Sequence, residues 1–160
     1  MKHGILLVAL ILAVGLGACT GTKSITHKRW DQHRNTVYLL DITVQNNGLA
    51  DAGDRLRLAL EDRLADSMFL VGEDPKQAKY QLKYKITQYK KGNRLKRLAT
   101  FGIDDDSRAV LDVKIALIGK EGVLGAWQIQ TWVRGGFTGG SDKELFIQAA
   151  DKILKHLKGY

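Results

Sequence analysis

Residues 109–133 form the stretch AVLDVKIALIGKEGVLGAWQIQTWV, which predicts the centre of the fold. Leu111, Val113, Ile115 and Leu117 alternate with Asp112 and Lys114, and within residues 123–133 Trp127 and Ile129 alternate with two glutamines. A two-residue period is typical of strands that have one buried and one wet face. Residues 119–122 supply two glycines at a tight turn, so the stretch predicts an antiparallel hairpin. On the return strand, one face should hold Trp127, Ile129, Thr131 and Val133, and the other should hold Gln128, Gln130 and Trp132.

Upstream of this hairpin, the same alternation predicts a further strand over residues 80–87. Its core face would hold Tyr80, Leu82, Tyr84 and Ile86, and its wet face Gln81, Lys83, Lys85 and Thr87. A first strand over residues 37–44 would place Tyr38, Leu40, Ile42 and Val44 on one side. Between them, the four-residue spacing of Leu56, Leu60 and Leu64 predicts a helix over residues 51–68, with Ala59 and Met68 widening its apolar stripe. A short buried strand follows at residues 69–71.

The chain ends in a second amphipathic helix. Ser141 and Glu144 have the spacing of a capping box, with Ser141 as the N-cap. The apolar stripe of this helix comprises Phe146, Ala149, Ala150, Ile153, Leu154 and Leu157. We therefore expect an α+β fold in the order β-α-β-β-β-β-α. Its mostly antiparallel sheet of four to five strands would carry both helices on one face.

The N-terminal segment ends in Leu16-Gly17-Ala18-Cys19, after a basic Lys2 and a short apolar run. This arrangement resembles the lipobox of bacterial lipoproteins, in which the cysteine is lipidated and the preceding peptide is removed. The resemblance implies a signal peptide at residues 1–18. We expect the lipidated Cys19 and a polar tether to occupy residues 19–36, before one globular domain at residues 37–160. An ordinary secretory peptide is the alternative. In such lipoproteins an aspartate directly after the cysteine resembles a signal for retention in the inner membrane. Here that position is Thr20, so the resemblance implies the outer membrane.

Composition limits the classes of function. The chain has 25 Lys and Arg against 17 Asp and Glu, and 44% of its residues are hydrophobic, so it should bury a real core. Its single cysteine would carry lipid and leave no thiol for catalysis or for a disulfide. Only His156 falls in the expected globular domain, where we predict a surface position at the end of the final helix. These features favour a protein that is not an enzyme and has no cofactor.

A run of basic residues is the strongest candidate for binding. It is free of Asp and Glu, and its candidate binding residues are Lys83, Lys85, Lys90, Lys91, Arg94, Lys96 and Arg97. Such a patch suits anionic lipid headgroups, an acidic glycan or an acidic partner protein. A lysine-rich face that keeps the protein soluble and protects a sheet edge is the alternative. Nucleic acid is not expected in this compartment.

Three weaker patterns favour structural interpretations. Residues 135–140 are glycine-rich before a helix, but no lysine follows them as a phosphate loop requires, so they predict a connection or a partner-contact loop. Residues 104–106 are three aspartates without the alternating ligands of a calcium loop, and they favour a solvated turn. A zinc site is not expected in the tether, although three donor residues occur there: His27, Asp31 and His33.

Residues 109–157 combine a hairpin with a glycine-containing turn, a Gly-Gly loop and a final helix. After a lipobox, this pattern resembles small outer-membrane lipoproteins of unassigned function. The layout is also similar to the amino-terminal domain of TolB and to the lipopolysaccharide-assembly lipoprotein. From this resemblance and the basic run together, we expect the protein to be a non-enzymatic binding or scaffold component of an envelope complex. It would lie at the periplasmic face of the outer membrane. It would contact the membrane through its lipid and an envelope protein through the sheet. A carrier or chaperone for lipopolysaccharide or a peptidoglycan fragment is the alternative.

Overall fold

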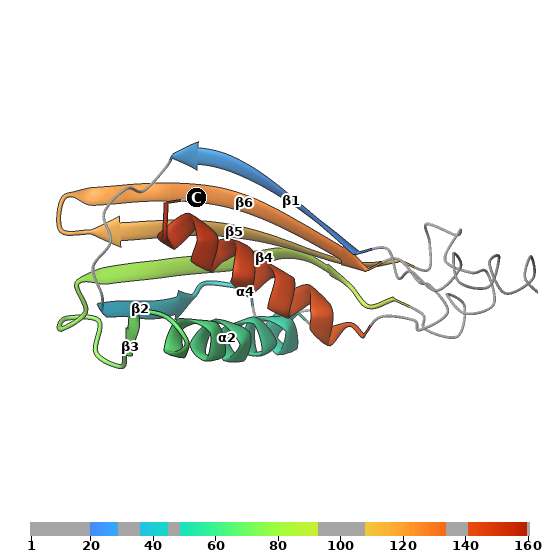
Figure 1. Cartoon of the computed structure of the whole chain (residues 1–160), viewed down its shortest axis with the longest axis horizontal. Coiled ribbons are helices and arrows are strands. Elements are labelled where there is room, and N and C mark those ends of the chain that lie inside the picture. Colours follow the sequence, from blue (N-terminus) through green and yellow to red (C-terminus); the bar gives the residue numbers. More distant parts are fainter. Residues whose placement is uncertain (1–19, 29–35, 45–48, 93–107, 134–140, 160) are drawn as a thin grey trace, which may run out of the picture.

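The computed structural model describes residues 20–28, 36–44, 49–92, 108–133 and 141–159 (Figure 1). Its strands are β1 (Thr20–Lys28), β2 (Thr36–Asp41), β3 (Leu70–Gly72), β4 (Tyr80–Lys90), β5 (Ala109–Gly119) and β6 (Gly122–Val133). Its helices are α2 (Leu49–Ala65) and α4 (Lys143–Leu157). Figure 1 shows both helices against the same side of one curved sheet, which confirms the expected α+β class.

The sheet has six strands in the order β1-β6-β5-β4-β2-β3. The β1/β6, β6/β5 and β5/β4 pairs are antiparallel, whereas β2 runs parallel to both β4 and β3. Helix α2 provides the crossover that parallel neighbours require.

The β5–β6 hairpin closes on paired Gly119 and Gly122. Gly122 has a φ of +110°, a backbone conformation that is unfavourable for any residue with a side chain.

Sequence alternation identifies the buried face of the three central strands correctly. The side chains that pack beneath the helices are Tyr80, Leu82, Tyr84 and Ile86 on β4, Leu111, Val113, Ile115 and Leu117 on β5, and Trp127, Ile129, Thr131 and Val133 on β6. Leu56, Leu60 and Leu64 of α2 are buried against this layer, as are Phe146, Ala149, Ala150, Ile153 and Leu157 of α4. One continuous core therefore lies between the sheet and the helix pair.

The predicted tether is wrong for residues 20–28, which form edge strand β1 instead. Each of its residues from Thr20 to Thr26 pairs in register with β6, beginning with Thr20 opposite Val133. The strand was missed because its residues on the helix side include Ser24, so no apolar alternation marks it. Backbone hydrogen bonds to an existing sheet do not need an apolar face. With β1 included, the sheet has six strands rather than four to five.

Several element ends also differ from expectation. Helix α2 ends at Ala65, and Met68 is 72% exposed rather than part of the stripe. The hydroxyl of Ser67 donates to the Leu64 carbonyl and accepts from the amide of Phe69, which turns the chain out of the helix. Helix α4 takes Asp142 as its N-cap, and Ser141 Oγ accepts from the Lys143 amide. Asp142 makes no side-chain capping hydrogen bond, so the capping box predicted from Ser141 and Glu144 does not form.

Strand β2 has its buried side opposite to the alternating set in the sequence. Val37 and Leu39 are buried in the core, while Tyr38 and Leu40 share the helix-free side of the sheet. Ile42 and Val44, which continue this alternating set, are 50% and 48% exposed. Residues 37–44 are apolar except for Asp41 and Thr43. Either side of the strand could therefore have been the buried one by sequence, and packing against α2 selects the side that is buried.

Several predictions fall outside the described residues. These are the lipobox with Leu16, Gly17, Ala18 and Cys19, the basic residues Arg94, Lys96 and Arg97, the aspartates at 104–106, the glycine-rich residues 135–140, and Asp31 with His33. They stay predictions.

Candidate binding face

The side of the sheet that carries no helix is the candidate site, and we call it the open face. Strand register arranges its side chains in cross-strand rows. One row comprises Lys23, Gln130, Asp112 and Gln88, taken from β1, β6, β5 and β4. The next row comprises Ile25, Gln128, Lys114 and Lys85 from the same four strands. The open face is thus built of long polar side chains rather than of a second apolar layer.

Two lysines of the open face stand directly opposite one another. Lys85 of β4 pairs with Lys114 of β5, and Lys83 follows on the same side of β4. Like charges placed opposite across two strands destabilise a sheet. Among the described residues, these lysines form no ion pair, and neither does Lys23 of β1. The arrangement therefore favours an anionic group that would neutralise them.

A small hollow opens beside this lysine pair. It has a volume of about 80 Å³ and is lined by Lys23, Ile25, Asp112, Gln128 and Gln130. Asp112 is only 8% exposed, and its Oδ1 atom has no hydrogen-bond partner in the described structure. The hollow therefore combines a buried acceptor with two amides and one cation.

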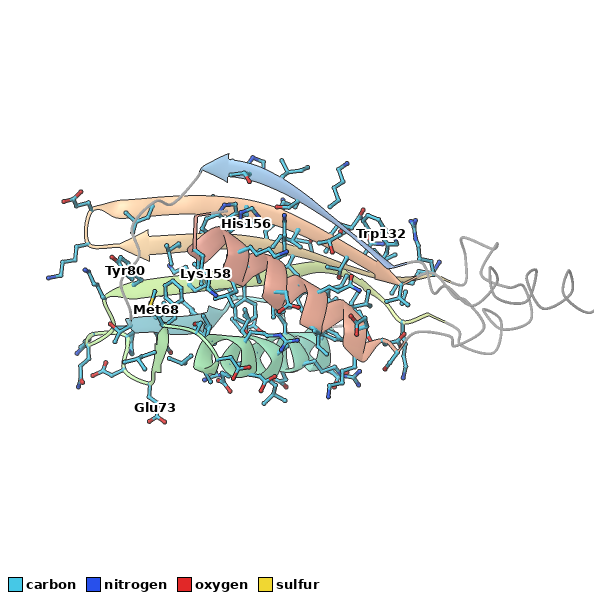
Figure 2. All side chains as sticks on the ribbon, in the orientation of Figure 1. Met68, Glu73, Tyr80, Trp132, His156 and Lys158 are labelled. Carbon is cyan, nitrogen blue, oxygen red and sulfur yellow. The ribbon has the colours of Figure 1, made fainter. Side chains whose placement is uncertain are left out.

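Trp132 borders the same face at the end of β6 (Figure 2). Its indole lies over Gly21 of β1, where a Cβ atom would clash with the ring. The absence of a side chain at Gly21 lets the ring lie against the backbone of the edge strand. Trp132 thus presents a half-buried aromatic surface next to the row that contains Asp112.

Lys83 and Lys85 of the predicted basic patch lie together on the open face, as the alternation of β4 predicted, and their binding role stays a prediction. Lys90 and Lys91 are exposed at the end of β4. Sequence reasoning missed Lys23 and Lys114, which the fold brings to the same face. The period of residues 111–117 already placed Lys114 on a wet side. Its cross-strand partner Lys85, however, comes from a segment about 30 positions earlier, and Lys23 reaches the same face only through the pairing of β1 with β6.

The expectation that His156 lies at the surface is wrong. Its side chain is 8% exposed and stacks on Trp127, with ring centroids 5.2 Å apart and planes inclined by 17°. Its Nε2 atom lies 2.6 Å from Ser24 Oγ of β1. Figure 2 shows His156 near the end of α4, beside the sheet. A serine–histidine contact is also the geometry of a nucleophile with its base, but here the imidazole is packed between helix and strands and fastens β1 to α4.

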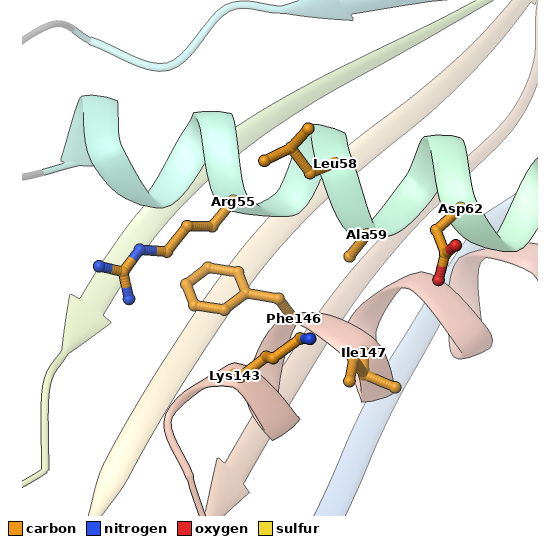
Figure 3. Close-up of a pocket in the computed structure, with 7 residues that line it drawn as sticks. All are labelled: Arg55, Leu58, Ala59, Asp62, Lys143, Phe146 and Ile147. Carbon is orange, nitrogen blue, oxygen red and sulfur yellow. The ribbon is translucent and has the colours of Figure 1, made fainter.

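A groove between the two helices is the second concave feature (Figure 3). It has a volume of about 590 Å³ and is lined by Arg55, Leu58, Ala59 and Asp62 of α2 and by Lys143, Phe146 and Ile147 of α4. The Arg55 guanidinium lies 6.0 Å from the centre of the Phe146 ring. Leu58 is 67% exposed at its rim. Its charges are of both signs, so it lacks the cationic character of the open face.

Two classes of feature are absent from the described parts of the chain. No helix there is long and apolar enough to cross a membrane. No three His, Cys, Asp or Glu side chains gather there in a way that would hold a metal ion.

Comparison with solved structures shows the fold. The PelC dodecamer from Paraburkholderia phytofirmans matches 89% of this chain and 99% of its own, with 14% identity and a TM-score of 0.56. A Xanthomonas campestris protein of the DUF330 family matches 81% of this chain and 85% of its own, with 12% identity and a TM-score of 0.46. TolB from Acinetobacter baumannii matches 87% of this chain and 32% of its own, with 12% identity and a TM-score of 0.39. No protein-family model and no curated protein matches the chain.

Proposed function

We propose that this protein is a non-enzymatic binding or scaffold component of a cell-envelope complex, anchored by a lipid on Cys19 at the periplasmic face of the outer membrane. The observation that carries the proposal is the division of the sheet into two sides. Both helices cover one side, whereas the other side exposes Lys23, Lys83, Lys85 and Lys114 with no ion pair among the described residues. A free cationic sheet face suits an anionic partner.

In this proposal, the lipid anchor precedes the start of β1 directly in the sequence. β1 begins at Thr20, the residue directly after Cys19, and Thr20 pairs with Val133. A lipid on Cys19 would then adjoin the end of the sheet where β1 begins and β6 ends, without a flexible tether. The exposed Lys90, which is the last residue of β4, and Lys91 lie at this same end of the sheet. Each would add on the order of 1 kcal/mol of attraction to an anionic bilayer surface.

The test is recovery of partners from native membranes in mild detergent, with the lipidated protein as bait. We compare the wild type with a Lys83→Glu/Lys85→Glu/Lys114→Glu variant. A matched control reverses three lysines away from the open face, Lys120→Glu, Lys143→Glu and Lys155→Glu. We expect one envelope protein in near-stoichiometric amount with the wild type and the control, and its loss with the open-face variant.

Two results would contradict the proposal. One is retention of the partner by the open-face variant, because the cationic face would then play no part. The other is full complementation of a deletion strain by Cys19→Ser protein released into the periplasm, because an anchored scaffold needs its anchor.

The opposed lysines also favour a second candidate, a carrier or chaperone of an anionic ligand such as lipopolysaccharide or a peptidoglycan fragment. Lys85 and Lys114 repel each other in the free protein, and a small acidic ligand would relieve that repulsion. The same membrane preparation distinguishes the candidates. Lipid or glycan recovered in stoichiometric amount without a protein would favour the carrier.

A further inference from the structure

The hollow on the open face contains a buried hydrogen-bond acceptor, Asp112 Oδ1, that has no partner among the described residues. Asp112 is more than nine-tenths buried, and its Oδ1 atom faces no donor within the described structure. Asp112 lines the hollow together with Gln128 and Gln130. A buried carboxylate without a hydrogen bond is costly, so it is retained where something supplies the donor. The hollow therefore offers Asp112 Oδ1 as an acceptor to a ligand group that donates a hydrogen bond.

The surrounding charges select the kind of donor. Lys23 lines the same hollow, and Lys114 follows Asp112 on the open face of β5. Two ammonium groups so close disfavour a cationic donor such as an amine, a guanidinium or a metal ion. A neutral hydroxyl carries no such penalty. The amides of Gln128 and Gln130 each offer a donor and an acceptor, which suits further hydroxyls next to the first.

The next row supplies a site for an acidic group. Residues i and i+2 of a strand lie about 7 Å apart on one face, so Lys114 and its partner Lys85 lie within the span of one or two sugar units from Asp112. Trp132 borders the hollow on its other side and presents an aromatic surface of the kind on which apolar sugar faces pack. Hydroxyl-accepting, acid-binding and aromatic groups thus lie in adjacent rows.

We propose that the open face binds an acidic glycan, with a sugar hydroxyl donating to Asp112 and a uronate-type carboxylate bound between Lys85 and Lys114. This inference rests on the proposed function, because it assigns a ligand class to the same face. It adds that recognition is directed at sugar hydroxyls and not at negative charge alone.

Three polymers test it by titration of the full-length protein in detergent. Polygalacturonate carries both hydroxyls and carboxylates, polyglutamate carries carboxylates alone, and dextran carries hydroxyls alone. We expect the wild type to bind polygalacturonate at least tenfold more tightly than either of the other two. Equal affinity for polygalacturonate and polyglutamate would overturn the inference, and so would failure to bind polygalacturonate.

Two variants separate the parts of the site. Asp112→Asn should weaken polygalacturonate binding by about tenfold, since the charge-assisted hydrogen bond from the sugar hydroxyl becomes a weaker neutral one, and should not weaken polyglutamate binding. Lys85→Gln/Lys114→Gln should weaken both. Lys120→Gln, in the β5–β6 turn, is the control and should change neither. Asp112→Asn should also raise Tm by about 3 °C, because an unpartnered buried charge is removed. Unchanged polygalacturonate binding by the folded Asp112→Asn protein would refute the role of Asp112.

The outcomes distinguish this inference from the proposed function. A protein partner that is captured through the open face, with no affinity for polygalacturonate, overturns the glycan inference and leaves the scaffold intact. Partner capture that ignores the open-face lysines, with Asp112-dependent polygalacturonate binding, overturns the scaffold and supports the glycan site.

Discussion

Replacing His156 with alanine tests the contact that holds the edge strand to the helices. His156 is 8% exposed, stacks on Trp127 and lies 2.6 Å from Ser24 Oγ. The substitution removes a hydrogen bond worth ~1 kcal/mol and an aromatic contact worth up to ~1 kcal/mol. It also leaves a cavity where a buried ring stood, at a cost of ~1–2 kcal/mol. We expect the free energy of unfolding to fall by about 3 kcal/mol and Tm by about 9 °C.

The assay is chemical denaturation of the His156→Ala, Ser24→Ala and double variants. Ser24→Ala should cost ~1 kcal/mol, and the double-variant cycle should give a coupling of ~0.5–1.5 kcal/mol for the Ser24–His156 bond. Lys155→Ala, on the exposed side of the same helix, is the control and should change stability by less than ~0.5 kcal/mol. If the two single effects add without coupling, or if His156→Ala behaves like Lys155→Ala, the packed position of His156 and the docking of β1 are refuted.

Three further substitutions address the two faces of the sheet. Gly21→Val should displace the Trp132 indole and cost ~1–3 kcal/mol, which a shift in tryptophan fluorescence and a lower Tm would report. Burial raises the pKa of Tyr84 well above its usual value of 10, and its hydroxyl has no hydrogen-bond partner among the residues that the structure describes. Because the folded-state pKa is the higher one, its contribution to stability is present below pH 10 and is lost as pH rises further. Tyr84→Phe should therefore flatten the fall in stability above pH 10, and a pH series of urea midpoints checks this. Lys85→Glu should pair with Lys114 and raise stability by ~0.2–1 kcal/mol while weakening binding at the open face; a loss of stability would contradict the opposed geometry.

The central strands and the helices could be predicted because their side chains carry a strong periodic signal. β4, β5 and β6 each bury every second residue, and α2 buries Leu56, Leu60 and Leu64 at four-residue spacing. β1 gave no such signal, because an edge strand is held by backbone hydrogen bonds to β6, and these are independent of side-chain type. The buried side of β2 was ambiguous for the opposite reason, since both of its sides are largely apolar.

The candidate site divides in the same way. Lys83 and Lys85 are near neighbours in the sequence, and alternation alone placed them on one wet face. Lys23, Asp112 and Lys114 join them only through strand register across β1, β6, β5 and β4. His156 has a polar identity typical of a surface position, and only its place over Trp127 makes it a packing residue.

The sequence by itself determined which residues form helices and central strands, because local periodicity decides which side chains can share a face. It also determined the cationic character of residues 76–97 and the lipobox pattern that ends in Cys19. The tertiary structure decided that residues 20–28 complete the sheet, that the lysine at 85 opposes the lysine at 114, and that a buried carboxylate lies between amides. Those features depend on pairing between segments far apart in the chain, where backbone hydrogen bonds and close packing select one register and no local pattern does.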